Sequence, residues 1–308
     1  MGVVRFSVEA PDAGVRLDAC VARALGCSRA EARRVLASGG VRVDGRVRGA
    51  SHKGEILQAG SEVEIPPWVP PEGRVPEAEP ELPLEFVASG PGWLAVDKPP
   101  GMPVHPLHEG ERGTALGAVV ARHPEVVGVG EGGLRSGVVH RLDVDTSGVL
   151  LFATDAAAWE RIRIAFREHR MEKVYRAIVL GRLDGADQID LPLEVARSRP
   201  ARVRVAEGGR LVSIAWRTVE TLDGATLVEA RPMTGFLHQI RVAFAHLGHP
   251  LVGDRRYGGG GEDDVSGADR HMLHACRIAG AGTEAEAPEP PDWSAVLARL
   301  RGLSPHVR

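Results

Sequence analysis

The stretch that decides the fold is VVHRLDVDTSGVLLFAT, residues 138–154 of a 308-residue chain. Apolar runs flank a polar turn that contains His140, Arg141, Asp143, Asp145, Thr146 and Ser147. We expect SGVVHRL (136–142) and GVLLFAT (148–154) to be strands, because both are short apolar runs bounded by turn residues. Two strands joined by this turn would place Asp143 where a sheet meets a cleft. Taken alone, the turn equally fits aspartates that only accept hydrogen bonds from turn amides.

Short strand patterns alternate with helical ones on both sides of this stretch. The expected strands include LAVDKPPG, KVYRAIVLG, LVSIAWRTVE and TLVEARP, and the expected helices are GTALGAVVARH, AAAWERIRIAFREH and LHQIRVAFAHLG. This mixture favours an α+β domain over residues 84–308, with a large mixed, mostly antiparallel sheet flanked by helices.

The last of these helices carries a second candidate for a site. Leu237, Ile240, Phe244 and Leu247 form an apolar stripe at helical spacing. Arg241 lies within or beside this stripe. A guanidinium that faces a core needs a carboxylate partner, because an unpaired buried charge is strongly destabilising. The spacing does not identify that partner.

A small module, residues 1–66, and a linker, residues 67–83, precede this domain. The stretch PPWVPPEGRVPEAEPELP contains seven prolines in 18 positions, which is typical of a semi-extended linker. In the module, residues 14–25 fit a helix, and a second helix begins at Ser28 with an S-x-x-E capping box. VRVDGRVRG turns at an Asp-Gly pair, a hairpin signal, and EVEI is expected to be another strand.

Six arginines of the module are candidate phosphate ligands, namely Arg16, Arg29, Arg33, Arg34, Arg46 and Arg48. A guanidinium can bind two phosphate oxygens at once, although such a cluster is more often a solvated face. The whole chain has 35 arginines and only three lysines, which codon usage also explains. Its net charge of −3 weighs against a nucleic-acid partner. Residues 1–66, however, contain ten basic and eight acidic side chains.

Several stretches together resemble two known families. HRLDVDTSG matches the signature of the RluA-type pseudouridine synthases, which modify large-subunit ribosomal RNA and some transfer RNA. LAVDKPPGMPVHP, GTALGAVVARHP, KVYRAIVLG, TGFLHQIRVAFAHLGHPLVGDRRYG and HMLHA recur in family order, so the resemblance covers nearly all of residues 84–276. Residues 16–49 resemble the small RNA-binding domain named after small-subunit ribosomal protein four. The resemblance implies a pseudouridine-synthase fold behind a small α/β RNA-binding domain.

The resemblance also implies roles for individual residues. Asp143 would be the catalytic residue, which attacks the anomeric carbon of a flipped-out uridine or stabilises positive charge there. Arg241 would pair with Asp143 and keep it ionised and oriented. Tyr175 would stack on the uracil, with a role in proton transfer left open, and Arg141 would fill the space that the uridine vacates.

The other residues of the turn are expected to support it. His140 is expected to be a structural hydrogen-bonding residue, and Thr146 and Ser147 to hold the turn. Phe236 and Leu237 stand where the family commonly has arginine followed by threonine or serine. This difference removes one phosphate-binding cation near the site and leaves the RNA substrate open.

No cofactor and no metal are expected, because the isomerisation oxidises nothing and consumes nothing. Gly128, Gly130 and Gly133 spell GxGxxG, but they follow a helical segment and are predicted to be a loop. His105 and His108 have a spacing compatible with metal binding, but no convincing third ligand is near them.

Composition sets further expectations. The chain is 43% hydrophobic and 26% charged, which is typical of a soluble globular protein, and no run approaches a membrane span. The start has no secretory signal pattern, and the three cysteines are too few for a disulfide framework, so we expect a cytoplasmic location. Residues 258–269 are predicted to be a flexible acidic loop. The expected partner is structured RNA, the expected state is a monomer, and no membrane association is expected.

The sequence therefore predicts an RNA pseudouridine synthase, an isomerase of specific uridines. Ribosomal RNA is favoured over transfer RNA, because a domain like the amino-terminal one is common in family members that act on ribosomal RNA. One alternative is a non-catalytic RNA-binding or ribosome-assembly protein, which would not need Asp143, Tyr175 and Arg241 together. Another is a hydrolase that uses Asp143 or a Ser–His pair, but the chain has no G-x-S-x-G elbow.

Overall fold

A computed structural model describes residues 2–198, 201–260 and 266–302 of the chain. Part of the predicted acidic loop, residues 261–265, lies outside the described residues. Within those three ranges, no helix has both the length and the apolar character needed to cross a lipid bilayer.

The chain divides into two compact units, Met1–Arg74 and Val75–Arg308. The division falls inside the predicted linker, residues 67–83. On one side of it, Trp68 is buried in the core of the first unit, and on the other, Leu84 is buried in a core of the second. The segment between the units therefore packs at both ends.

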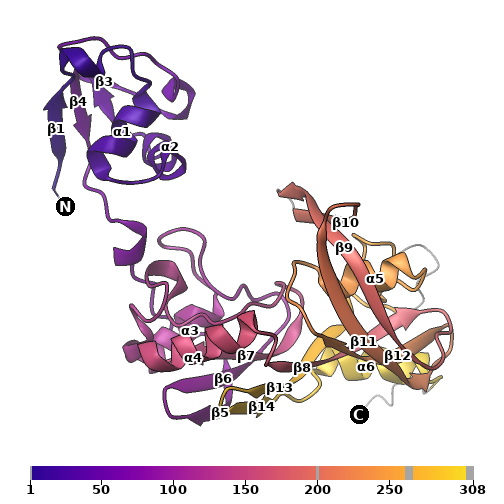
Figure 1. Ribbon diagram of the computed structural model, residues 1–308. Helices are drawn as coiled ribbons and strands as arrows, with labels where there is room; N and C mark the ends of the chain where they lie inside the picture. Colours follow the sequence, from indigo (N-terminus) through magenta and orange to yellow (C-terminus); the bar gives the residue numbers. More distant parts are fainter. Residues whose placement is uncertain (1, 199–200, 261–265, 303–308) are drawn as a thin grey trace. The chain divides into compact units, whose positions relative to one another are not determined.

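The first unit is a four-stranded antiparallel sheet with two helices (Figure 1). Its elements are β1 (Val4–Ser7), α1 (Leu17–Leu25), α2 (Arg29–Ala37), β2 (Arg42–Val43), β3 (Arg46–Val47) and β4 (Glu62–Ile65), with strand order β1-β4-β2-β3. The predicted helices, hairpin and last strand are confirmed; β1 was not predicted. The Ser28 hydroxyl accepts a hydrogen bond of 3.2 Å from the Glu31 amide, so the predicted cap forms. The Glu31 carboxylate pairs with Arg34 and Arg74 instead of completing the capping box.

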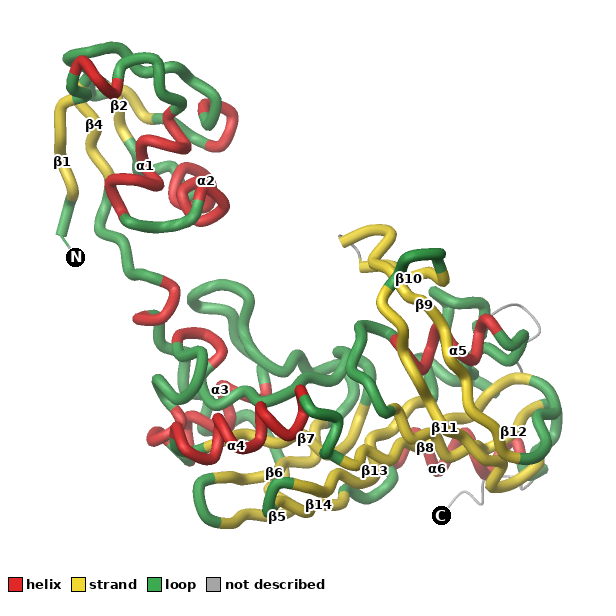
Figure 2. The backbone as a smooth tube through the Cα atoms, viewed as in Figure 1, coloured by secondary structure: helices red, strands yellow, loops and turns green. Residues whose placement is uncertain are grey.

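The second unit is built on a ten-stranded sheet that is mixed and mostly antiparallel, as predicted (Figure 2). Its strands are β5 (Glu85–Gly90), β6 (Trp93–Lys98), β7 (Ser147–Ala153), β8 (Glu172–Leu180), β9 (Ala186–Ser198), β10 (Ala201–Val205), β11 (Arg210–Thr221), β12 (Ala225–Pro232), β13 (Leu273–Gly280) and β14 (Thr283–Glu286). The order is β10-β9-β11-β12-β8-β13-β7-β6-β5, with β14 paired to β13. Only β13 and β7 pair in parallel among these strands. The helices are α3 (Ala115–Arg122), α4 (Ala156–Arg167), α5 (Gln239–His246) and α6 (Pro291–Leu300).

Helices pack on both faces of this sheet, because successive strand residues point to opposite sides. In β8, Ala177 and Val179 belong to the core that includes α5, whereas Ile178 belongs to the core that includes α6. The same alternation in β6 and β7 separates a core with α3 from a core with α4. Strands buried on both faces read as continuous apolar runs, as GVLLFAT does.

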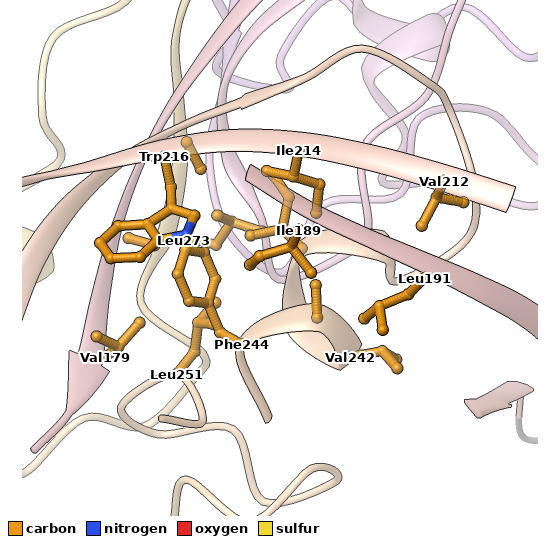
Figure 3. Close-up of a cluster of buried hydrophobic side chains, with 14 of the residues drawn as sticks. Val179, Ile189, Leu191, Val212, Ile214, Trp216, Val242, Phe244, Leu251 and Leu273 are labelled. Carbon is orange, nitrogen blue, oxygen red and sulfur yellow. The ribbon is translucent and has the colours of Figure 1, made fainter. Parts of the chain in front are cut away.

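Figure 3 shows the core that carries α5. The side chains of Ile214 and Trp216 from β11 lie against Phe244 of α5, and the rings of Trp216 and Phe244 meet edge to face at 6.3 Å. Ile240 is also buried here, as predicted, but Leu247 at the end of the predicted stripe is 39% exposed. Packing against β9 and β11 thus fixes the position of the helix that carries Arg241.

Residues 136–142 do not form the predicted strand; only β7 after the turn is a strand. The carbonyl of Val138 accepts a hydrogen bond from the Trp159 indole, and that of Val139 accepts one from Arg163. Two backbone carbonyls of this segment therefore accept hydrogen bonds from side chains of α4. Val138 also forms an isolated β-bridge with Phe152 of β7.

Candidate active site

Asp143 lies in the turn that leads into β7. The Asp143 carbonyl accepts a hydrogen bond from the Thr146 amide at 3.1 Å. The Thr146 hydroxyl forms a buried hydrogen bond of 2.9 Å with His271, and Ser147 forms one of 3.0 Å with His274. The segment HMLHA thus supports the turn from β13, a contact that the sequence did not predict.

A buried lysine holds the other side of the turn. Lys98 is fully buried, and its ammonium donates to the carbonyls of Pro99, Met102 and Val144 at 2.8, 2.9 and 2.8 Å. Burial lowers the pKa of Lys98 to about 7. The three carbonyls fix the backbone directly after Asp143 to the loop after β6. The sequence predicts no role for this lysine.

Arg241 on α5 reaches the carboxylate of Asp143, as predicted. Its Nη1 donates to Asp143 Oδ2 at 3.0 Å. Its Nε and Nη2 donate to both oxygens of Asp254 at 2.7 and 2.9 Å. Burial lowers the pKa of Arg241, but the hydrogen bonds and charges of Asp254 and Asp143 outweigh it and raise that pKa overall. Arg241 is therefore a permanent cation that bridges two carboxylates.

Asp254 is the main partner of Arg241 and was not predicted. Its side chain is 1% exposed, and burial alone would raise the pKa of its carboxyl group. The hydrogen bonds and charge of Arg241 outweigh burial and lower it. This two-point contact sets the plane of the guanidinium, so that Nη1 points to Asp143.

His238 and Tyr257 complete the surroundings of Asp143 and were also missed. His238 is buried at the start of α5 in a left-handed conformation (φ 54°), which is uncommon for a residue other than glycine. Its Nδ1 lies 2.7 Å from the Tyr257 hydroxyl, which also accepts a hydrogen bond from the Val203 amide. If the hydroxyl donates this hydrogen bond to Nδ1, the neutral imidazole carries its proton on Nε2. Nε2 lies 3.8 Å from Oδ2 of Asp143. Burial outweighs the charge of Asp143 and lowers the pKa of His238.

Both neighbours of the Asp143 carboxylate approach the same oxygen, Oδ2. Among the described residues, Oδ1 of Asp143 makes no hydrogen bond. The side chain is 17% exposed and lines a cavity of about 730 Å³. One oxygen is thus held, while the other is free to meet a ligand.

Tyr175 on β8 lines the same cavity. Burial, and then the charge of Asp143, raises the pKa of the Tyr175 phenol. The phenol therefore stays protonated at neutral pH, which makes it a hydrogen-bond donor rather than a base. No described residue accepts or donates a hydrogen bond at its hydroxyl.

Basic side chains form much of the cavity wall; they are Arg141, Arg163, Arg167, Lys173, Arg210 and Arg241. Arg141 is exposed and has no hydrogen bond or ion pair with a described residue. Lys173 donates to the Thr234 carbonyl at 2.8 Å, and burial lowers its pKa to about 8. Phe236 and Leu237, where the resemblance leads us to expect arginine followed by threonine or serine, also line the cavity.

His140 is held on both sides. Its Nε2 accepts a hydrogen bond of 2.9 Å from the Leu151 amide, and its ring stacks on Phe166 at 5.0 Å. Burial lowers the pKa of His140 to about 3. The imidazole is therefore neutral at physiological pH.

The buried histidines predict acid sensitivity. Burial also lowers the pKa of His271 to about 3, far below its unfolded value near 6.5. Below about pH 6.5 the unfolded chain binds a proton that the folded chain does not. As the pH falls from about 6.5 towards about 3, each such histidine therefore lowers the free energy of unfolding by about 1.4 kcal/mol for each pH unit. We expect urea denaturation at pH 7, 6 and 5 to show this loss.

His271→Gln is the matched variant, because its amide can still bond Thr146 without titrating. It should lose less stability than the wild type between pH 7 and 5, by roughly 1–2 kcal/mol. An unchanged pH slope in this variant would contradict the assignment of a neutral His271.

In the first unit, five of the six predicted RNA ligands are paired with carboxylates. Arg16, Arg29 and Arg33 contact Asp18, Arg34 contacts Glu31, and Arg48 contacts Glu55. Arg46 is exposed, and it has no hydrogen bond or ion pair with a described residue.

Two weaker sequence signals have simple outcomes. Gly128 and Gly130 lie in turns after α3, as predicted, whereas Gly133 begins a short 3-10 helix, Gly133–Arg135, before β7. His105 contacts the carbonyl of Pro106. Within the described part of the chain, no group of three histidine, cysteine, aspartate or glutamate side chains is arranged to hold a metal ion.

Comparison with known families gives two matches. Residues 92–246 match the model of the RNA pseudouridylate synthases, and residues 15–53 match that of the S4 domain. The first match contains Asp143, Tyr175 and Arg241, and the second contains Asp18.

Relatives match along nearly the whole chain. An RNA pseudouridine synthase of Chloroflexus aurantiacus, described as uncharacterized, is 36% identical over 93% of this chain and 90% of its own length. Ribosomal large subunit pseudouridine synthase D of Vibrio parahaemolyticus is 30% identical over 97% of this chain and 95% of its own. The structure of human RNA pseudouridylate synthase domain containing 1 is similar in fold, with a TM-score of 0.56, 24% identity, and coverage of 72% of this chain and 87% of that one.

Proposed function

Because the chain belongs to the RNA pseudouridylate synthase family, we propose that it isomerises specific uridines of large-subunit ribosomal RNA. It is an RNA pseudouridine synthase, and its substrate is RNA. The ribosomal target is supported by relatives that are named as large-subunit synthases, among them those of two Vibrio species. The observation that carries the proposal is a carboxylate, Asp143, held by Arg241 in a cavity with basic walls.

The reaction breaks the bond between N1 of uracil and C1′ of ribose and forms one between C5 and C1′. The hydrogen on C5 is released, and N1 gains one, so nothing is oxidised or reduced. The Asp143 carboxylate attacks C1′ or stabilises positive charge that develops there. It acts through Oδ1, because Oδ2 is occupied by Arg241.

Arg241 keeps Asp143 in position rather than reacting itself. A permanent cation 3.0 Å from Oδ2 favours the charged form of the carboxylate. Asp254 holds the guanidinium from the other side, so Arg241 cannot turn away when RNA enters. Asp254 is thus a positioning residue that acts through Arg241.

Tyr175 contacts the extruded base, and Arg141 occupies the place that the base leaves. The target uridine must leave its stack, at a cost of a few kcal/mol. The Tyr175 ring offers a face against the extruded uracil, and its protonated hydroxyl offers a donor. Arg141 is exposed at the cavity and free to fill the space that the uridine leaves.

The amino-terminal unit adds RNA affinity through its arginines, as proposed for Arg16, Arg29, Arg33, Arg34, Arg46 and Arg48. Five of these residues are exposed, whereas the Arg48 side chain is 17% exposed. Such contacts bind backbone phosphates and carry little sequence information. All the residues proposed for chemistry come from one chain, which is consistent with action as a monomer.

Mapping of pseudouridines in RNA from cells with and without this gene tests the target. We expect one or a few uridines of large-subunit ribosomal RNA to lose the modification in the deletion strain. The wild-type gene should restore them, and a gene with Asp143→Asn should not. Loss confined to transfer RNA would overturn the ribosomal target, and loss at no uridine would contradict the proposed function.

A further inference from the structure

Asp18 in the first unit is surrounded by three arginines. Its side chain is completely buried, at the second position of α1. It accepts hydrogen bonds from Arg16 Nε at 3.2 Å, from Arg33 Nε at 2.8 Å, and from Nη2 of Arg29 at 2.9 and 3.1 Å. These contacts lower the pKa of Asp18 although its burial raises it. The carboxylate is therefore ionised.

The positive charge of the cluster exceeds the negative charge of Asp18. One arginine would neutralise the carboxylate, but three surround it, which leaves a net charge of +2. The three guanidinium side chains remain 44%, 50% and 46% exposed. Partly exposed ion pairs contribute little stability, and the arginines repel one another.

The position on the helices is also unfavourable for cations. Arg16 is the N-cap of α1, and Arg29 is the first residue of α2, which lies beside α1 (Figure 1). Helix N-termini carry partial positive charge and favour anions. The excess positive charge of the cluster, next to helix N-termini, is therefore suited to an anionic ligand.

We propose that Asp18 is a positioning residue that assembles Arg16, Arg29 and Arg33 into a site for RNA backbone phosphates. Asp18 contacts Nε of Arg16 and Arg33 and Nη2 of Arg29. The other N–H donors of these half-exposed side chains make no hydrogen bond with a described residue and can meet phosphate oxygens. Preorganisation of this kind avoids the entropy cost of ordering long side chains when RNA binds. The inference rests on the proposed function, because that supplies the RNA.

Asp18→Asn in the full-length chain distinguishes a positioning role of Asp18 from an effect of net charge on RNA affinity. The substitution makes the protein more basic, so long-range attraction alone predicts tighter RNA binding. If Asp18 orders the three arginines, binding becomes weaker, by at least about tenfold. Glu64→Gln is the matched control, since it removes the same charge from an exposed carboxylate of the same unit that pairs with Arg5. It should bind as tightly as the wild type or slightly tighter.

The probe is a labelled transcript of large-subunit ribosomal RNA, with affinity measured at several salt concentrations. Amide exchange of residues 17–37 shows whether α1 and α2 remain folded in Asp18→Asn. Should that variant unfold, Arg29→Gln and Arg33→Gln replace it, because two arginines still pair with Asp18 in each. Each should weaken binding and reduce the slope of log affinity against log salt by about 1.

A double variant tests whether Asp18 acts through the arginines. Asp18→Asn should weaken binding less in an Arg29→Gln background than in the wild type. Folded Asp18→Asn that binds like Glu64→Gln would overturn the inference, as would Arg29→Gln and Arg33→Gln that bind like the wild type. Activity of the wild type on the same transcript separates the two claims: if it forms pseudouridine, the proposed function stands whichever way Asp18 behaves.

Discussion

Asp143→Asn is expected to abolish pseudouridine formation, with a loss of at least about 10³-fold in the rate of the chemical step. Asparagine has nearly the shape of aspartate, but its amide can neither attack C1′ nor stabilise positive charge there. Arg241 keeps its two contacts with Asp254, so stability should change by only about 1 kcal/mol. Release of tritium from C5-labelled uridine in a single-turnover reaction measures the rate.

Asp145→Asn is the matched control. Asp145 lies in the same turn and is exposed, but its side chain is not part of the cavity wall. This variant should retain activity within a fewfold of the wild type. A folded Asp143→Asn protein that keeps a tenth or more of the wild-type rate would sink the assignment of Asp143.

Arg241→Gln is expected to be the most destabilising of the substitutions considered. It leaves Asp254 buried without its cation, and removal of one partner from a buried pair costs about 3–5 kcal/mol. The free energy of unfolding, measured by urea denaturation, should fall by that amount. Activity should fall too, because Oδ2 of Asp143 loses its donor.

Arg241→Lys distinguishes the contribution of Arg241 to the stability of the fold from its role in orienting Asp143. Its ammonium can still neutralise Asp254, so part of the stability should return. It lacks the planar fork that contacts two carboxylates at once, so we expect activity to stay at least about tenfold below the wild type. Arg182→Gln, at an exposed pair with Asp184, should cost less than about 1 kcal/mol and is the control. Full activity in Arg241→Lys would show that charge alone suffices.

Much of the fold follows from local pattern. The Ser28 cap begins α2 where the sequence predicts it, because the cap involves residues only three apart. The apolar run after the turn becomes β7, since a short apolar run bounded by turn residues is typical of a strand buried on both faces. The segment 136–142 reads as a similar run but is irregular. The carbonyls of Val138 and Val139 accept hydrogen bonds from side chains of α4, whereas that of Gly137 accepts one from the Ala153 amide of β7. β9 was not predicted, although Ile189, Leu191 and Leu193 alternate along it and all lie in the core that includes α5. Pro192 cannot donate a hydrogen bond to a neighbouring strand, so it argues locally against a strand that its neighbours β10 and β11 nevertheless pair with.

Some residues of the candidate site were predicted from the sequence, and others are found only in the structure. Asp143, Tyr175 and Arg241 were named from the sequence through family resemblance, and the structure places all three at one cavity. Asp254 and His238 lie in the same quoted stretch as Arg241, but nothing in their spacing marks them as neighbours of Asp143. The left-handed backbone of His238 is visible only in the structure.

The sequence alone determined that this chain has a small arginine-rich module, an α+β domain, and a carboxylate and a guanidinium suited to one site. Only the tertiary structure decided which charges meet. The pair of Arg241 and Asp143 is 98 residues apart in the chain, and the sheet that joins β8, β13 and β7 brings it together. Likewise, the packing of α1 against α2 places three arginines on Asp18. Electrostatic partners depend on distances of a few ångströms, and sequence spacing fixes such distances only within a single helix, strand or turn.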